Sequence, residues 1–233
     1  MQLNVKNTIL RSLANALAPH YCVSCDRVGG VLCECCREYY IEQLFEQCLV
    51  CGLVTSGAGA CGRCRPQVAY SRGWAATERD EVIGRLIDEY KWRHNAAALD
   101  ACATLLDDAV PILPPDTIVV PVPTIAPHVR QRGFAHAERI AAAFARQRRL
   151  PYRAVVTRRA NYVQRGSTRR ARQRQASESY DCTIATTGGR YVVIDDVMTT
   201  GATLDAVARV LRQRGAEEVY VAVVARQPLD DAA

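Results

Sequence analysis

Cysteines crowd the first third of the chain and limit what that segment can fold into. Nine of the eleven cysteines lie between residues 22 and 64. Eight of them form Cys-x2-Cys pairs, namely Cys22, Cys25, Cys33, Cys36, Cys48, Cys51, Cys61 and Cys64. Each pair presents two thiolates to one tetrahedral metal, so four pairs supply two closed sites. The segment has little room for an apolar core, and we therefore expect two structural Zn2+ ions to fold it.

The spacing leaves the pairing of these cysteines open. Sequential sites would join neighbouring pairs into two ribbons, whereas interleaved sites would give a cross-braced module. Disulfides are rare in cytoplasmic chains, and a redox function would need only one Cys-x2-Cys pair. Cys35 is left over, because the x2 spacing favours Cys36 as the ligand.

The sequence changes character near residue 66, where longer periodic segments begin. Apolar residues recur with helical spacing over residues 81–93, 96–110, 133–150 and 202–215. Short apolar runs predict strands over residues 116–123, 154–158, 190–197 and 217–226. Alternating strands and helices favour an α/β fold with a mainly parallel sheet. We expect an N-terminal helix over 1–20, the cysteine module over 21–66, and the α/β domain over 67–233, with a mobile basic loop at about 160–180.

The charge of the chain is positive and almost entirely arginine. The formal net charge is +6, and the basic residues are arginines except for Lys6 and Lys91. Twelve arginines and no acid lie between Arg139 and Arg174, which fits either an anionic partner such as nucleic acid or phosphate, or a merely solvated basic face. No apolar run approaches the ~20 residues that span a bilayer. We expect a cytoplasmic protein that does not insert into membranes.

Residues 192–203, VVIDDVMTTGAT, place two adjacent aspartates at the end of a predicted buried strand. Two like charges there repel each other and lose solvation, so they need positive or hydroxyl-bearing partners. A strand that enters a helix through a tight turn forms a phosphate cradle from backbone N–H groups. The segment therefore predicts a site for a ribose 5-phosphate, with the phosphate in the turn and the sugar hydroxyls at Asp195 and Asp196.

This segment resembles the 5-phosphoribosyl-1-pyrophosphate (PRPP) motif of the type I phosphoribosyltransferases: apolar residues, two acids, then Thr-Gly-x-Thr. The whole chain resembles the ComF family of competence-associated proteins and its GntX-like relatives, on VPVP (120–123), Arg132-Gly133-Phe134 and YKWR (90–93) in addition. The resemblance implies a type I phosphoribosyltransferase-like α/β fold with a mainly parallel sheet, preceded by a small four-cysteine zinc-binding module.

The resemblance also implies an activity and residues for it. It assigns a catalytic role to Asp195, Asp196 and Arg132, and phosphate binding to Arg130 and Lys91. The turn that would bind PRPP comprises Val197, Met198, Thr199, Thr200, Gly201, Ala202 and Thr203. The expected reaction is the Mg2+-dependent displacement of pyrophosphate from PRPP by an unknown acceptor. The alternative is a non-enzymatic accessory protein of DNA uptake, which binds single-stranded DNA through the zinc module and the arginine-rich loop beside a helicase.

Overall fold

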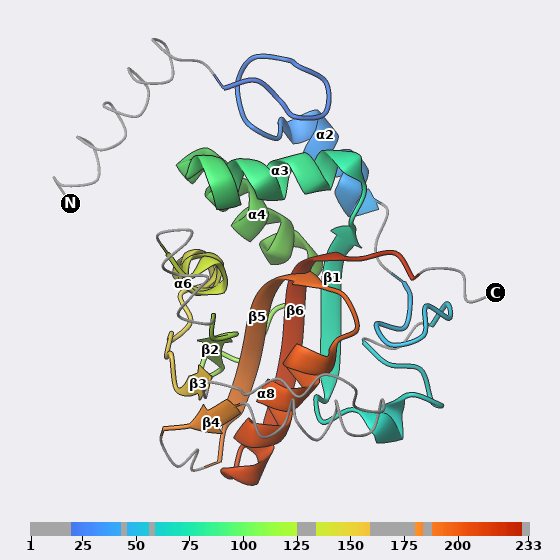
Figure 1. Cartoon of the computed structure of the whole chain (residues 1–233), viewed down its shortest axis with the longest axis vertical. Coiled ribbons are helices and arrows are strands. Elements are labelled where there is room, and N and C mark those ends of the chain that lie inside the picture. Colours follow the sequence, from blue (N-terminus) through green and yellow to red (C-terminus); the bar gives the residue numbers. More distant parts are fainter. Residues whose placement is uncertain are drawn as a thin grey trace, which may run out of the picture.

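A parallel four-stranded sheet forms the centre of the molecule (Figure 1). The computed structural model describes residues 20–42, 46–55, 59–124, 134–158, 180–183 and 188–229. The strands are β1 (Arg72–Glu78), β2 (Ile118–Pro121), β5 (Arg190–Met198) and β6 (Glu218–Arg226), in the order β1-β6-β5-β2. Each neighbouring pair is parallel, so the carboxyl ends of all four strands meet at one edge.

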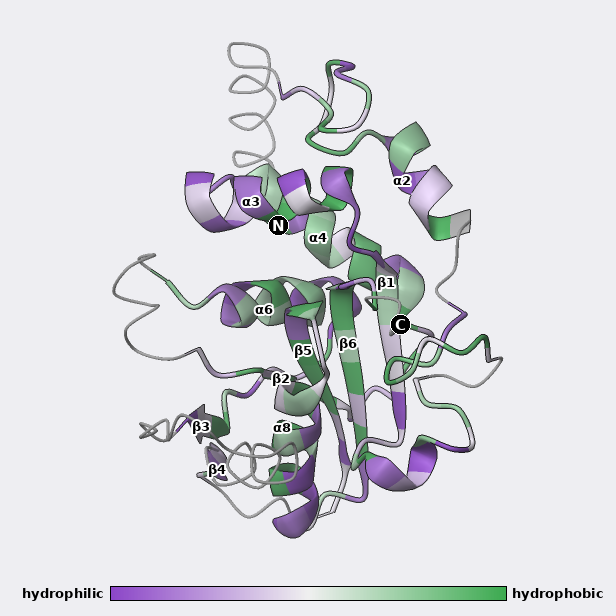
Figure 2. Cartoon of the chain, turned by 45° about the vertical axis from the view of Figure 1, so that its right-hand side comes forward, coloured by the Kyte–Doolittle hydropathy of each residue, from purple (hydrophilic) through white to green (hydrophobic). Residues whose placement is uncertain are grey.

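Helices cover both faces of this sheet. Helices α4 (Ala96–Ala109) and α6 (His136–Arg148) pack on one face, and α8 (Ala202–Gln213) packs on the other. Helix α3 (Glu81–Arg93) packs on α4 beyond the carboxyl ends of the strands. Strands buried on both faces read as continuous apolar runs, which Figure 2 shows for β5 and β6. The expected α/β fold with a mainly parallel sheet is confirmed.

Several elements differ from the expectation. Strand β1 was not predicted, because its sequence RGWAATE has few β-branched residues. It forms because it pairs along its length with β6, which lies far along the chain. The small antiparallel pair of β3 (Val156–Arg158) and β4 (Tyr180–Cys182) was half predicted, since only β3 was expected. Helix α2 (Glu34–Glu42) and the 3-10 turn η1 (Arg65–Gln67) lie in the cysteine-rich segment and were also missed.

Helix α3 is held at both ends. Asp80 caps its first turn by accepting a hydrogen bond from the Ile83 N–H at 2.7 Å, and the Tyr40 hydroxyl of α2 donates to the same carboxylate at 2.7 Å. Near the other end, the buried Tyr90 hydroxyl donates to the main-chain oxygen of His136, where α6 begins. These contacts fix α3 over the edge at which the strands end.

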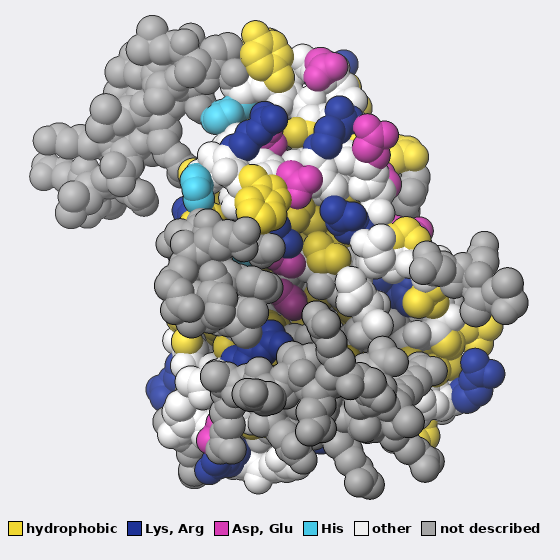
Figure 3. Space-filling model, in the orientation of Figure 1, with side chains coloured by type: hydrophobic (Ala, Val, Ile, Leu, Met, Phe, Trp, Pro, Cys, Tyr) yellow, Lys and Arg dark blue, Asp and Glu magenta, His cyan; other side chains and the backbone are white. Residues whose placement is uncertain are grey.

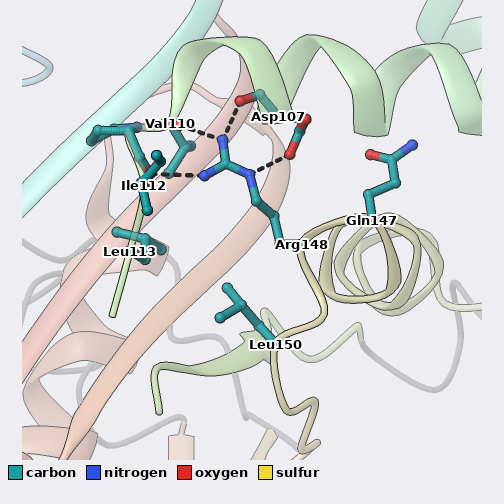
Figure 4. Close-up of a pocket in the computed structure, with 8 residues that line it drawn as sticks. Asp107, Val110, Ile112, Leu113, Gln147, Arg148 and Leu150 are labelled. Carbon is teal, nitrogen blue, oxygen red and sulfur yellow. Dashed lines mark hydrogen bonds and ion pairs between the residues drawn. The ribbon is translucent and has the colours of Figure 1, made fainter. Parts of the chain in front are cut away.

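The carboxyl end of α4 is closed by one arginine from α6 (Figure 4). Arg148 donates to the carboxylate and the main-chain oxygen of Asp107, and to the main-chain oxygens of Val110 and Pro111. These carbonyls have no partner within the helix, so the guanidinium acts as the cap. A hollow of about 510 Å³ lies here, and polar and apolar residues line it, among them Arg148, Ile112 and Leu113.

Some expectations fall on residues that the structure does not describe. The N-terminal helix lies outside the described residues except for His20, and so does the expected basic loop except for Tyr180. The domain boundary near residue 66 stays a prediction. Within the described residues, no helix has the length and apolar character needed to cross a membrane.

Two glycine substitutions test the packing. A Cβ at Gly73 of β1 would lie 2.7 Å from both Leu49 Cδ1 and Val221 Cγ2, which are buried side chains. A Cβ at Gly84, inside α3, meets nothing closer than 3.6 Å. We expect Gly73→Ala to lower the free energy of unfolding by about 1–3 kcal/mol through overpacking. Gly84→Ala should raise it by about 0.5–1 kcal/mol, because alanine favours the helix.

Urea denaturation of both variants and of the wild type measures these changes in the free energy of unfolding. Equal unfolding midpoints for Gly73→Ala and the wild type would contradict the register in which β1 packs between Leu49 and β6.

Candidate functional site

The two adjacent aspartates lie at the carboxyl end of β5, and their side chains face different parts of the molecule. Side chains alternate along a strand, and β5 sends Val192 and Ile194 into the core beneath α4 and α6, and Val193 into the core beneath α8. The same alternation carries Asp196 to the α3 side, where Lys91 meets it. Asp195 instead lines a small hollow of about 40 Å³ with residues of the following turn. The chain thus separates two like charges by the pleat of one strand.

Asp196 forms an ion pair with Lys91 of α3. The Lys91 Nζ lies 2.8 Å from Asp196 Oδ2, and the two side chains are 17% and 13% exposed. Opposite charges at this distance stabilise each other, which compensates part of the cost of removing them from water. Lys91 was expected to reach phosphate groups; the structure places its Nζ beside the Asp196 carboxylate, and the phosphate contact stays a prediction.

Asp195 carries an unusual carboxyl group. It accepts a hydrogen bond from the Asp196 N–H at 2.9 Å. Burial and, after it, the charge of Asp196 raise the pKa of Asp195 to about 8, while the Asp196 N–H and Lys91 act in the opposite direction. This carboxyl therefore takes up a proton more readily than an ordinary aspartate, and when protonated it can donate a hydrogen bond as well as accept one.

The turn after β5 is shaped by Gly201. Its φ of +74° lies in the left-handed region, and a Cβ there would stand 2.3 Å from Met198 Cε. Helix α8 begins directly after it without a side-chain cap, and the exposed Thr199 and Thr200 precede it. The backbone N–H groups at this helix start, together with the helix dipole, favour an anion. Asp195, Val197, Met198, Thr199, Gly201, Ala202 and Thr203 line the hollow here.

Tyr180 closes one side of this turn. The side chain belongs to β4, is buried, and lies next to Thr203. Arg158 of β3 lies over its ring, with Cζ 5.4 Å from the ring centroid. The β3–β4 pair therefore brings an aromatic ring and a cation next to the turn, which the alternating pattern of the main sheet did not indicate.

Two expected site residues, Arg130 and Arg132, lie outside the described residues. Phe134, which follows that segment, packs between His94 and His136, with ring centroids 4.9 Å and 4.7 Å away. The first residues of α6 are thereby held against the end of α3. On the face drawn in Figure 3, acidic side chains are visible deep in a hollow that Lys and Arg side chains flank.

The eight paired cysteines gather into two groups, in the sequential arrangement. Cys22, Cys25, Cys33 and Cys36 form one group, and Cys48, Cys51, Cys61 and Cys64 form the other. Within each group the sulfur atoms all lie within 4.8 Å of one another. Cys35 belongs to neither group and is exposed.

The two groups are built alike. The Cys33 N–H donates to Cys22 Sγ at 3.4 Å, and the Cys61 N–H donates to Cys48 Sγ at 3.3 Å. Burial acts to raise the pKa of Cys22, but this and other backbone N–H groups lower it to about 6. The pKa of Cys48 falls to about 6 for the same reasons. Closed sets of four cysteines whose sulfur atoms converge in this way fit a tetrahedral metal such as Zn2+.

The second group is tied to the sheet by a buried arginine. Arg226, the last residue of β6, is 1% exposed, and its Nε donates to the main-chain oxygen of Leu49 at 3.0 Å. Leu49 lies between Cys48 and Cys51, so the cysteine loop rests on the edge where β6 ends.

Residues 123–231 match the family described as the phosphoribosyl transferase domain. They include β5, the Gly201 turn and α8, which build the cradle described above. This part of the chain is thus similar to a phosphoribosyl transferase domain. Over most of its length it is similar to "Competence protein F" of Haemophilus influenzae, at 26% identity over 84% of this chain and 90% of that protein. It is equally similar to "DNA utilization protein YhgH" of Salmonella typhi, at 26% identity over 82% of this chain and 88% of the relative.

Solved structures overlap with part of the chain. The glutamine PRPP amidotransferase of B. subtilis shares 18% identity, covering 58% of this chain and 30% of that one, with a TM-score of 0.40. The adenine phosphoribosyltransferase of Thermoanaerobacter pseudethanolicus shares 16% identity, covering 58% and 83%, with a TM-score of 0.38.

Metal content tests the cysteine groups. We expect elemental mass spectrometry of the purified protein to find two Zn2+ ions per chain. Cys22→Ser and Cys48→Ser should each lose one ion, because each breaks one closed set of four thiolates. Cys35→Ser is the matched control and should keep both ions. Loss of metal in Cys35→Ser, or full metal content in Cys22→Ser, would contradict the grouping.

The pH dependence of stability tests Asp195. An aspartate in an unfolded chain has a pKa of about 3.9, so between pH ~4 and 8 the folded protein binds more protons than the unfolded one. The stability that Asp195 contributes is therefore present below pH ~4 and is lost as the pH rises towards 8. Asp195→Asn lacks this loss. The free energy of unfolding of the variant minus that of the wild type should therefore be larger at pH 8 than at pH 5 by more than ~1 kcal/mol. The measurement is urea denaturation of both proteins across this pH range at fixed ionic strength. Free energies of unfolding that change with pH in parallel for the two proteins would contradict the raised pKa of Asp195.

Proposed function

We propose that the chain binds PRPP at the end of β5 and transfers its phosphoribosyl group to an acceptor. The single observation that supports this most is the geometry of β5 and α8. A buried strand ends in two carboxylates and enters, through a left-handed glycine, a helix that has no side-chain cap. This arrangement lies inside the segment that matches the phosphoribosyl transferase domain.

The roles follow from the surroundings of each residue. The 5-phosphate of the ligand would lie at the helix start, where N–H groups and the hydroxyls of Thr199, Thr200 and Thr203 face an anion. The ribose hydroxyls would bind Asp195 and Asp196, at the end of the preceding strand. A proton held by Asp195 would let it donate to one ribose oxygen.

Departure of pyrophosphate leaves positive charge on the ribose ring, so the chemistry needs electrostatic stabilisation more than a strong base. In this proposal the carboxylates would lie beside the ribose on which that cation develops. The sequence resemblance assigns Arg130 and Arg132 to the leaving pyrophosphate, and a guanidinium fork suits its oxygens. Mg2+ is expected to arrive with PRPP and to neutralise phosphate charge. The acceptor is not specified by the described residues.

A second function, single-stranded DNA binding in DNA uptake, is supported by the names of the relatives. They are called a competence protein and DNA utilization proteins. The formal charge of +6 and the twelve arginines between Arg139 and Arg174 suit a polyanion. In this alternative the turn between β5 and α8 would only sense a ligand or would have lost its function, and a helicase would be a partner of the protein.

Calorimetric titration with PRPP and Mg2+ tests the first function. We expect saturable binding by the zinc-loaded wild type. Asp195→Asn/Asp196→Asn should weaken it at least a hundredfold, because hydrogen bonds to charged groups contribute about 1.5–3 kcal/mol each. Asp116→Asn is the matched control, since Asp116 is 60% exposed and precedes β2, away from the strand ends.

A folded wild type that binds no PRPP would contradict the first function. In that case, single-stranded DNA binding whose affinity falls steeply with salt would favour the second.

A further inference from the structure

Lys91 lies outside the matched domain and yet contacts its acidic pair. The Lys91 Nζ stands 2.8 Å from Asp196 Oδ2. The two side chains are 17% and 13% exposed, so water and salt screen the pair less than they would at the surface. Lys91 is in the last turn of α3, where the helix dipole also favours a cation.

The lysine is held in place by its helix. Its neighbour Tyr90 is fully buried and donates to the main-chain oxygen of His136, which fixes the end of α3 against α6. Cys102 of α4 is fully buried and lies close enough to Asp196 and Lys91 to feel both charges. The packing of α3 therefore fixes the Lys91 ammonium group at the end of β5.

Two adjacent carboxylates attract divalent cations, because carboxylate oxygens are ligands that such cations prefer. Asp196 faces α3, where it meets Lys91, and Asp195 lines the hollow of the Gly201 turn. A fixed ammonium group beside one of the two carboxylates repels any second cation that approaches it.

We propose that Lys91 reserves the Asp195–Asp196 pair for the hydroxyl groups of a sugar and keeps divalent cations from binding to it. A carboxylate has about four lone-pair sites, and Lys91 occupies one of those on Asp196. The remaining sites accept neutral hydroxyl donors at no electrostatic cost. The sugar in this statement rests on the proposed function. Any Mg2+ that accompanies PRPP is then held by the phosphate oxygens of the ligand and not by these carboxylates.

The test is a titration of zinc-loaded protein with Mn2+ in the absence of any sugar phosphate, followed by electron paramagnetic resonance. We expect the wild type to have no submillimolar Mn2+ site that depends on Asp196. Lys91→Met should gain one site with at least tenfold higher affinity, and Lys91→Met/Asp196→Asn should lack it.

Two controls separate this effect from a general change of charge. Lys91→Arg keeps the cation and should gain no Mn2+ site. Arg93→Met removes a cation from the same helix at a side chain that is 76% exposed and pairs with Glu89, and it should gain none either. A gained site in Arg93→Met equal to that in Lys91→Met would overturn the proposal.

The proposal also fails on two other outcomes. It fails if the wild type binds Mn2+ at a site that Asp196→Asn abolishes, a result that does not depend on whether Lys91→Met folds. It fails if folded, zinc-loaded Lys91→Met gains no site. A separate titration of the wild type with ribose 5-phosphate, with and without Mg2+, distinguishes the sugar site from the role of Lys91. No binding in either case would contradict the sugar site. The Mn2+ result would still decide whether Lys91 excludes divalent cations.

Discussion

Two neighbouring carboxylates at the end of a buried strand are the constraint on which much of this structure depends. Neither can lose its water without a partner, and their mutual repulsion adds to the cost. The pleat of β5 sends one to α3 and the other to the Gly201 turn. The partner for Asp196 has to come from a helix placed over the strand ends, so the Asp80 cap and the Tyr90 anchor of α3 serve the site as well as the fold.

The candidate site is consequently larger than the domain that the family match covers. Residues 123–231 supply the acidic pair, the turn and α8, but the cation against Asp196 comes from residue 91. Helix α3 in turn begins where Asp80 binds both its own first turn and Tyr40 of the cysteine-rich segment. Three stretches of chain that look separate in the sequence thus meet at one edge of the sheet.

Much of this could be predicted from sequence where the signal is local. Spacing identified the eight cysteines, and periodicity found α3, α4 and α8 to within a few residues. The same reasoning foresaw a positive partner for the aspartates but did not identify it as Lys91, because a pairing between α3 and β5 depends on tertiary packing. Strand β1 was missed for a similar reason: its residues have weak strand preference, and the distant strand β6 supplies its hydrogen bonds. The sequential grouping of the cysteines became clear only once their sulfur atoms were placed.

The buried contact between Arg226 and Leu49 bears on how such a protein can change over evolutionary time. Two parts joined by a flexible linker can be exchanged or lost one at a time, but here the last residue of a core strand finds an acceptor in the cysteine loop. Deleting the first 66 residues would remove that acceptor and leave the buried Arg226 Nε without the hydrogen bond that it makes there. Descendants of this chain should therefore inherit the two parts together, and recombination that separates them should be selected against.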